Sequence, residues 1–126
     1  PLFPQRLLNL FFNERRCCEG LRSTYFIRVG RSAQITGPYL DKDGVHLNNR
    51  GGSLFAGLDY AANYSDDYNT PSERHGRTGR ELGPGHIGIF TTPEGLEFYT
   101  YHYYDSATTH GEPTLGMRSL IWGDDG

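Results

Sequence analysis

The sequence has little of what nucleic-acid-binding proteins and membrane proteins need. Twelve Lys and Arg residues stand against 15 Asp and Glu, for a net charge of -3 over 126 residues. Binding to nucleic acid or to an anionic membrane surface requires clustered positive charge. No apolar run approaches the ~20 residues of a membrane-spanning helix. We therefore expect neither nucleic acid nor a membrane as a partner.

Cysteine is also scarce, since the only two are adjacent, Cys17 and Cys18. A disulfide framework needs pairs that are separated along the chain. A bond between neighbouring cysteines remains an alternative, but we expect two free thiols that pack as small apolar groups.

The sequence is instead rich in glycine and aromatic residues, with 17 Gly, 9 Tyr and 7 Phe. Short apolar runs separated by Gly and Pro turns, without helical periodicity, predict an all-β fold of the sandwich, barrel or propeller type. The polar stretch 58–82 predicts a long loop. The expected strands are Leu7–Asn13, Ser23–Gly30, Ser53–Ala56, His86–Phe90, Leu96–Tyr104 and Pro113–Trp122.

Several polar residues invite a functional interpretation, but spacing alone favours a structural one. Asp41–Gly44 lacks the later ligands of an EF-hand and reads as a turn. Asp105, Asp124 and Asp125 read as solvated turn residues, and His102 as a hydrogen-bonded core residue. His86 stands out because Gly83–Gly85 is expected to form a tight turn that fixes it at a strand entrance.

A resemblance to a known family rests on many short motifs that occur in a familiar order. The family is glycoside hydrolase family 43, specifically the C-terminal part of its arabinanases, and the chain resembles it from about Leu8 to Gly126. The motifs are Leu10–Asn13, Cys17–Gly20, Ser23–Tyr25, Val29–Ser32, Ile35–Tyr39, Asp41–Gly44, Gly83–His86, Tyr101–Asp105, Pro113–Leu115 and Trp122–Gly126.

The resemblance implies a five-bladed β-propeller, of which residues 1–126 would be a C-terminal fragment of about two blades. It implies an enzyme that hydrolyses α-1,5-linked arabinan, a plant cell-wall polysaccharide, with inversion. Three carboxylates perform this reaction in the family, and all precede the matching region. We therefore expect no catalytic residue here and no activity from this stretch alone. Pro1 would match the proline that follows the family's catalytic glutamate.

The resemblance also implies a metal-binding residue and a set of substrate-binding residues. His86 matches a histidine that, with water molecules, holds a calcium ion in the central channel. Cys17, Cys18, Ser23 and Thr24 fall in a segment near the active centre and are expected to bind substrate. The whole protein is expected to be an extracellular or periplasmic monomer.

Two alternatives remain beside this interpretation. One is a non-catalytic carbohydrate-binding β module, which the tyrosine content would suit because a ring face stacks on sugar C–H groups. The other is a different specificity within family 43, such as an arabinofuranosidase or a xylosidase.

Overall fold

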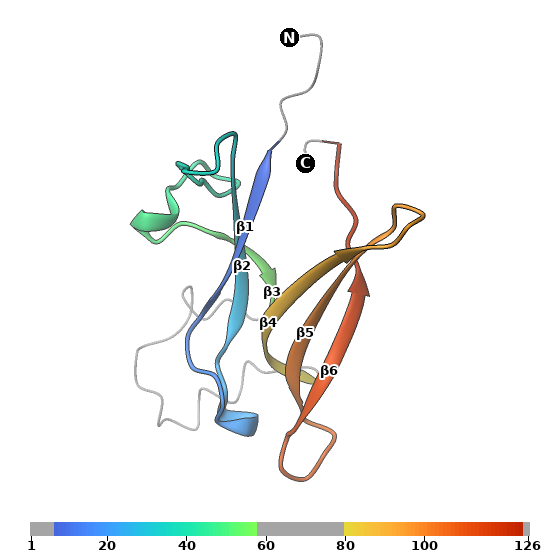
Figure 1. Ribbon diagram of the computed structural model, residues 1–126. Coiled ribbons are helices and arrows are strands. Elements are labelled where there is room, and N and C mark those ends of the chain that lie inside the picture. Colours follow the sequence, from blue (N-terminus) through green and yellow to red (C-terminus); the bar gives the residue numbers. More distant parts are fainter. Residues whose placement is uncertain (1–6, 58–79, 125–126) are drawn as a thin grey trace.

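The structure, a computed structural model, describes residues 7–57 and 80–124. Six strands and two short 3₁₀ helices occur in this part of the chain (Figure 1). In order, they are β1 (Leu8–Glu14), η1 (Gly20–Arg22), β2 (Phe26–Ser32), η2 (Leu47–Asn49), β3 (Ser53–Ala56), β4 (Glu81–Thr91), β5 (Glu97–Asp105) and β6 (Glu112–Ser119). The expected all-β class is confirmed, and neither three-residue helix could cross a membrane.

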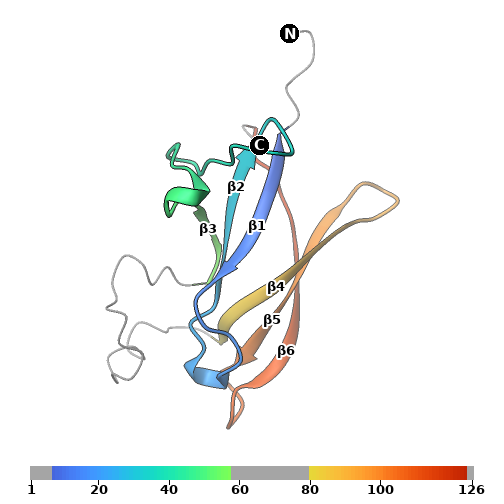
Figure 2. The same ribbon diagram turned by 60° about the vertical axis from the view of Figure 1, so that its left-hand side comes forward.

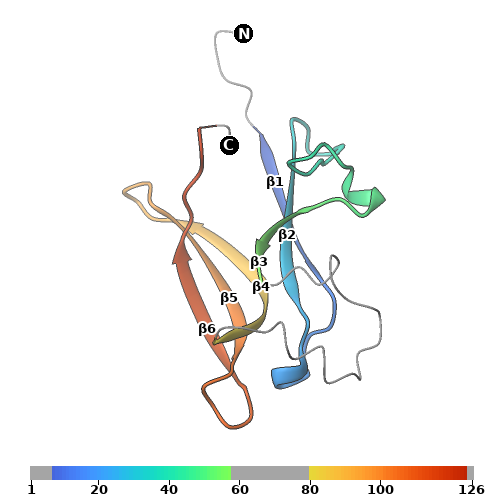
Figure 3. The ribbon, with the colours of Figure 1, turned by 180° about the vertical axis from the view of Figure 1, so that it is seen from behind.

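The strands form two antiparallel sheets, β1-β2-β3 and β4-β5-β6, each a meander of consecutive strands. The sheets lie side by side and diverge toward the end where β1 begins and the segment after β6 finishes (Figures 1 and 3). The described residues close no propeller. η1 and the β5–β6 hairpin lie at the opposite end, near each other in both views (Figures 1 and 2).

The core is small and lies where the two sheets meet. Phe26 and Ile27 at the start of β2 are fully buried. Phe55 on β3 makes edge-to-face contacts with Phe11 on β1 and with Tyr99 on β5, with both pairs of ring centroids 4.9 Å apart. Such contacts stabilise beyond the area they bury. This aromatic row therefore joins all three strands across the sheet boundary.

Arg28 is the main polar group of the first sheet's interior, with only 8% of its surface exposed. Its Nε donates to Glu14 Oε2 at 2.7 Å, and its NH1 nitrogen donates to the Gly52 carbonyl at 2.6 Å. Because a buried charge is tolerated only when it is paired and hydrogen-bonded, these two bonds fix the relative positions of β1, β2 and the entry to β3.

The strand predictions agree with the structure except at two starts and one end. β6 ends at Ser119, so Leu120–Trp122, expected in the last strand, lie outside it. β2 begins at Phe26, so Ser23–Tyr25 lie outside the strand. β4 begins at Glu81, five residues earlier than expected, and carries Gly83–Gly85 inside it. The expected turn is wrong: the pairing of β4 with β5 shifts register on both sides of Gly85, so these residues form bulges. Most of the expected loop 58–82 lies outside the described residues.

Candidate functional site

The turn after β1 carries the two cysteines, and they are bonded to each other. The expectation of free thiols is therefore wrong. Both residues are exposed, so they do not pack as core groups. Arg15 and Cys18, with φ of 71° and 70°, place the chain in the left-handed region on both sides of Cys17. This backbone turns the disulfide out to the surface.

Ser23 and Thr24 lie behind this turn and hold its shape. Ser23 is fully buried and Thr24 is 5% exposed. Ser23 Oγ accepts from the Glu19 N–H at 3.0 Å, and Thr24 Oγ1 accepts from the Arg16 N–H at 3.2 Å. The Thr24 N–H in turn donates to the Arg16 carbonyl at 2.9 Å. The two hydroxyls thus serve the backbone that presents the cysteines.

His86 lies on β4 and is exposed, with a φ of 58° that places it in the left-handed region. Its backbone N–H donates to Asn13 Oδ1 at 3.1 Å, although 73 residues separate the two in sequence. Asn13 Nδ2 donates to the Phe26 carbonyl at 3.2 Å. The Asn13 side chain, at the end of β1, therefore links both sheets and holds the backbone of His86.

Two glycines before His86 are required by close approach to the residues that follow η1. A Cβ on Gly85 would lie 2.3 Å from ring carbons of Tyr25. A Cβ on Gly83 would lie 2.8 Å from the Cβ of Ser23, and the φ of Gly83 is +59°. Any side chain at these positions would push β4 away. The Gly83–His86 segment and the turn that carries the cysteines consequently belong to one site.

His102 on β5 is the neighbour of His86, with ring centroids 5.8 Å apart at an interplanar angle of 72°. It is exposed, so the expectation of a core histidine is wrong. Tyr99, Tyr101 and Tyr103 follow one another along the other face of β5, where the first two rings stack and the Tyr103 ring is tilted against that of Tyr101. In the part of the chain that the structure describes, no three His, Cys, Asp or Glu side chains gather as metal ligands.

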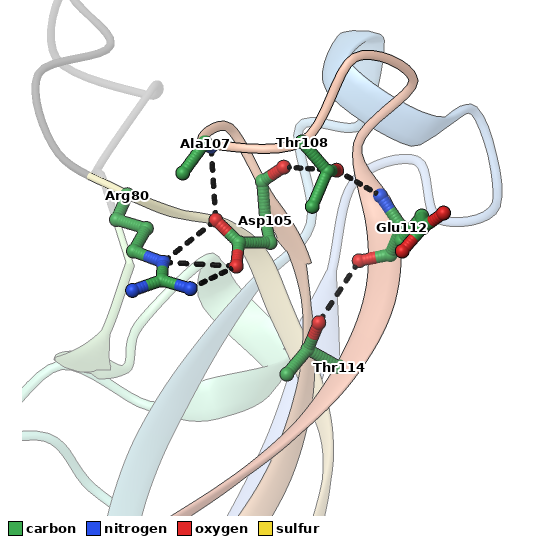
Figure 4. A network of polar contacts seen from close by, with 6 residues as sticks. All are labelled: Arg80, Asp105, Ala107, Thr108, Glu112 and Thr114. Atoms are coloured by element: carbon green, nitrogen blue, oxygen red, sulfur yellow. Dashed lines mark hydrogen bonds and ion pairs between the residues drawn. The ribbon is translucent and has the colours of Figure 1, made fainter.

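At the end of β5, Asp105 anchors the start of the β5–β6 hairpin (Figure 4). It is 3% exposed, which corrects its reading as a solvated turn residue. Arg80 Nε donates to both carboxylate oxygens, at 2.7 and 2.8 Å, and the Ala107 N–H donates to Oδ1 at 2.9 Å. The hydrogen-bonded Arg80 guanidinium holds the pKa of Asp105 below its ordinary value. The carboxylate is thus ionised and hydrogen-bonded to Arg80 and to the Ala107 N–H.

The same network continues into the hairpin, which packs on η1. Thr108 Oγ1 donates to the Asp105 carbonyl at 2.8 Å and accepts from the Glu112 N–H at 2.7 Å (Figure 4). A Cβ on Gly111 would lie 2.6 Å from the Leu21 side chain. Because η1 directly follows the Cys17–Cys18 turn, this contact supports the turn from below.

A second polar cluster joins β4, β5 and β6 where the sheets meet. Tyr101, 3% exposed, donates its hydroxyl hydrogen to Glu81 Oε2 at 2.6 Å and accepts from Arg118 Nε at 2.8 Å. Burial and the bond to Glu81 raise the pKa of Tyr101. The bonds to Tyr101 and Glu81 raise the pKa of Arg118 in turn. The cluster is internally satisfied and structural.

The sequence did not identify the residues that contact the predicted site residues. Asn13, Tyr25 and His102 all contribute to the site, and none was singled out as a site residue. Asn13 follows an apolar run and is polar at a strand end, which is a signal that many solvated residues share. Ser23 and Thr24 support the turn that carries Cys17 and Cys18. His86 lies in the middle of β4 and is linked to the same region through Asn13 and through the contact of Gly83 with Ser23.

Comparison with known proteins places this arrangement among the glycoside hydrolases. No family model matches the chain. The chain is 33% identical to the extracellular exo-α-(1→5)-L-arabinofuranosidase of Cellvibrio japonicus, over 93% of its own length and 28% of the relative's. It is 35% identical to the extracellular endo-α-(1→5)-L-arabinanase 1 of Bacillus subtilis, over 85% of its own length and 26% of the relative's.

Solved structures give the same answer. The chain superposes on Cellvibrio cellulosa α-L-arabinanase with a TM-score of 0.74 and 32% identity, covering 95% of this chain and 31% of that one. It superposes on the family 43 endo-arabinanase of Bacillus licheniformis with a TM-score of 0.72 and 30% identity, covering 98% of this chain and 34% of that one. The chain belongs to glycoside hydrolase family 43, as the sequence resemblance implied. It spans little more than a quarter of the first curated relatives' length.

Proposed function

We propose that the protein containing this chain hydrolyses α-1,5-linked arabinan with inversion at the anomeric carbon. The observation that carries the proposal is the meeting of the Cys17–Thr24 segment with Gly83–His86, in a chain whose curated relatives are named for action on α-(1→5)-linked arabinose. A further support is the likeness to an arabinanase solved in complex with arabinohexaose, at a TM-score of 0.73.

For the whole molecule, we propose a five-bladed β-propeller in which residues 1–126 form about two blades at the C-terminal end of the catalytic domain. Each three-stranded meander offers three of the four antiparallel strands that a propeller blade contains. The name "extracellular" borne by two relatives supports an extracellular or periplasmic location. We expect the full-length protein to be a monomer.

The reaction itself is assigned to carboxylates outside this chain. Inversion requires an acid at the leaving oxygen and a base on the opposite face, far enough apart to admit a water molecule. The residues of this chain bind and orient the substrate instead. The exposed sulfur pair of Cys17 and Cys18 offers a polarizable, apolar surface to sugar C–H groups. Ser23 and Thr24 contribute by holding that surface in place.

Calcium at His86 is a further part of the proposal. The described residues offer this imidazole and the neighbouring His102, but no group of three or more His, Cys, Asp or Glu side chains. Calcium prefers oxygen to nitrogen, so the two imidazoles do not form a calcium site alone. Water molecules or residues beyond those described would have to complete the coordination. When bound, the ion would supply positive charge close to the reacting carboxylates.

The decisive experiment offers the full-length protein linear α-1,5-arabinan and, separately, xylan. We expect arabino-oligosaccharides from the first only, with the inverted anomer appearing first in the proton NMR spectrum. Release of xylose or of side-chain arabinose from xylan would favour a xylosidase or an arabinofuranosidase. Binding of arabino-oligosaccharides with no product from either polymer would favour the non-catalytic module.

The metal role of His86 is tested by His86→Ala in the full-length protein, with His110→Ala in the exposed hairpin as the matched control. We expect loss of bound calcium by elemental analysis and a lower turnover number in the first variant only, with an unchanged circular dichroism spectrum. Equal calcium content in both variants would remove the metal from the proposal.

The substrate role of the cysteine pair is tested by the double variant Cys17→Ala, Cys18→Ala. Removing the sulfur surface is expected to raise the KM for arabino-oligosaccharides, whereas the control Glu19→Ala in the same turn leaves KM as it is. An unchanged KM in the double variant would show that the disulfide does not face the substrate.

A further inference from the structure

A pocket of about 210 Å³ lies at the far end of β1 from the site described above. Asn9 and Phe11 line it, whereas Asn13, which holds His86, lies four residues after Asn9 on the same strand. At about 3.3 Å per residue, Asn9 lies about 13 Å and Phe11 about 7 Å from Asn13 along the strand. Neither Asn13 nor His86 lines the pocket, which is therefore distinct from the site described above.

Its walls are aromatic and are fixed in position. Phe11 and Phe55 meet edge to face at 4.9 Å and form one wall. Trp122, the only tryptophan of the chain, lines the pocket from the segment after β6 and keeps 40% of its surface exposed. Its indole N–H donates to Glu97 Oε2, and the Leu120 N–H donates to the Glu97 carbonyl at 2.8 Å. The ring is therefore both accessible and held in orientation.

The rim of the pocket is polar and is braced by Asp41. One carboxylate oxygen accepts the backbone N–H groups of Asp43 and Val45, and the other accepts that of Gly52 at 2.9 Å. These bonds confirm the turn expected at Asp41–Gly44. The next residue, Lys42, lines the pocket, and its backbone N–H donates to Ser53 Oγ at 2.9 Å. The exposed side chains of Lys42 and Asn9 thus border the aromatic wall on a fixed loop and strand.

We propose that this pocket is a second carbohydrate-binding site that takes one pentofuranose unit of an arabinan chain. Aromatic faces stack on the C–H groups of a sugar, while amide and ammonium groups at the edge hydrogen-bond its hydroxyls. The volume is below the ~300–1,000 Å³ of pockets for drug-sized ligands, which matches a single small sugar ring. The proposal rests on the proposed function for the identity of the sugar.

A second site away from the reacting bond holds the polymer without taking part in catalysis. Its removal therefore weakens binding to long chains and raises the KM for them, but leaves the turnover number at saturation as it was. A residue needed only for folding would lower the turnover number on every substrate. This difference separates a binding role from a structural one.

The test uses the full-length protein and the variants Trp122→Ala, Trp122→Phe and Lys42→Ala. The control is Ile121→Ala, which changes the neighbouring, 86% exposed side chain outside the pocket. Retardation by soluble linear arabinan in a native gel measures polymer binding. Turnover of saturating arabinotriose is the internal reference for the fold.

We expect Trp122→Ala to bind arabinan about fivefold more weakly, as loss of one stacked ring implies. Trp122→Phe should recover most of the retardation, and Lys42→Ala should show a smaller loss in the same direction. Equal retardation of wild type and Trp122→Ala would overturn the proposal. So would a fall in arabinotriose turnover as large as the loss in retardation, or retardation by polygalacturonate in place of arabinan. A protein that is retarded by arabinan without cleaving it would refute the proposed hydrolysis while leaving this site intact.

Discussion

Replacing Asn13 by Ala should loosen the contact between the two sheets and release the backbone of His86. The side chain accepts from the His86 N–H at 3.1 Å and donates to the Phe26 carbonyl at 3.2 Å. At about 0.5–1.5 kcal/mol for each hydrogen bond, the two together contribute about 1–3 kcal/mol to the free energy of unfolding. Urea unfolding of the full-length protein measures the total loss. Hydrogen exchange of the peptide spanning 84–88, followed by mass spectrometry, measures the His86 bond separately.

The variant Asn13→Asp separates the two bonds because a carboxylate accepts but cannot donate. It should lose stability, since its oxygen would face the Phe26 carbonyl, yet it should retain the protection of the His86 amide. Asn13→Ala should lose both, with exchange about fivefold faster for a bond of ~1 kcal/mol. Asn48→Ala, in the exposed η2, is the control for loss of an amide side chain. Unchanged exchange at residues 84–88 in Asn13→Ala would refute the assigned role.

Three further outcomes follow from buried contacts in the second sheet. Gly85→Ala places a methyl group 2.3 Å from the Tyr25 ring, so we expect a loss of about 1–3 kcal/mol in urea unfolding; a smaller loss would mean that Tyr25 moves freely. Tyr101→Phe removes the bond to Glu81 and should cost about 1–2 kcal/mol near neutral pH. Because folding raises the pKa of Tyr101 above 10.0, the stability that the Tyr101 hydroxyl contributes is complete below pH 10.0 and falls as the pH rises through the folded-state pKa. An equal loss of stability above pH 10.0 in wild type and in Tyr101→Phe would contradict this role. Folding lowers the pKa of Asp105 below 3.8, so wild type should exceed Asp105→Asn in stability above pH 3.8 and lose that advantage as the pH falls through the folded-state pKa; a constant difference down to pH 2 would argue against it.

Much of the strand pattern could be predicted from the sequence, because alternation and turn residues act locally. Ser53–Ala56 was predicted with the bounds of β3. Gly83–Gly85 was misread because glycine and proline favour a turn on local grounds. The structure uses them in bulges, since β4 must pass close to Tyr25 and Ser23. Only the tertiary contact distinguishes the two uses.

The site shows the same division between local and distant causes. The resemblance assigned roles near the active centre to both His86 and the cysteine turn. The position of His86 depends on Asn13, however, which is 73 residues away in the sequence. No local pattern marks such a residue. The exposure of His102 was equally hidden, because the alternation of β5 assigns it to a face without saying which face is covered.

The bond between Cys17 and Cys18 joins residues that are one position apart. A crosslink restricts an unfolded chain more when it closes a longer loop, roughly with the logarithm of the loop length, and this one closes almost none. Its formation needs no long-range structure, and its loss should cost the folded protein little global stability. Mild reductants therefore give a reversible chemical means of altering one patch of the surface in the intact molecule, with no change in its sequence.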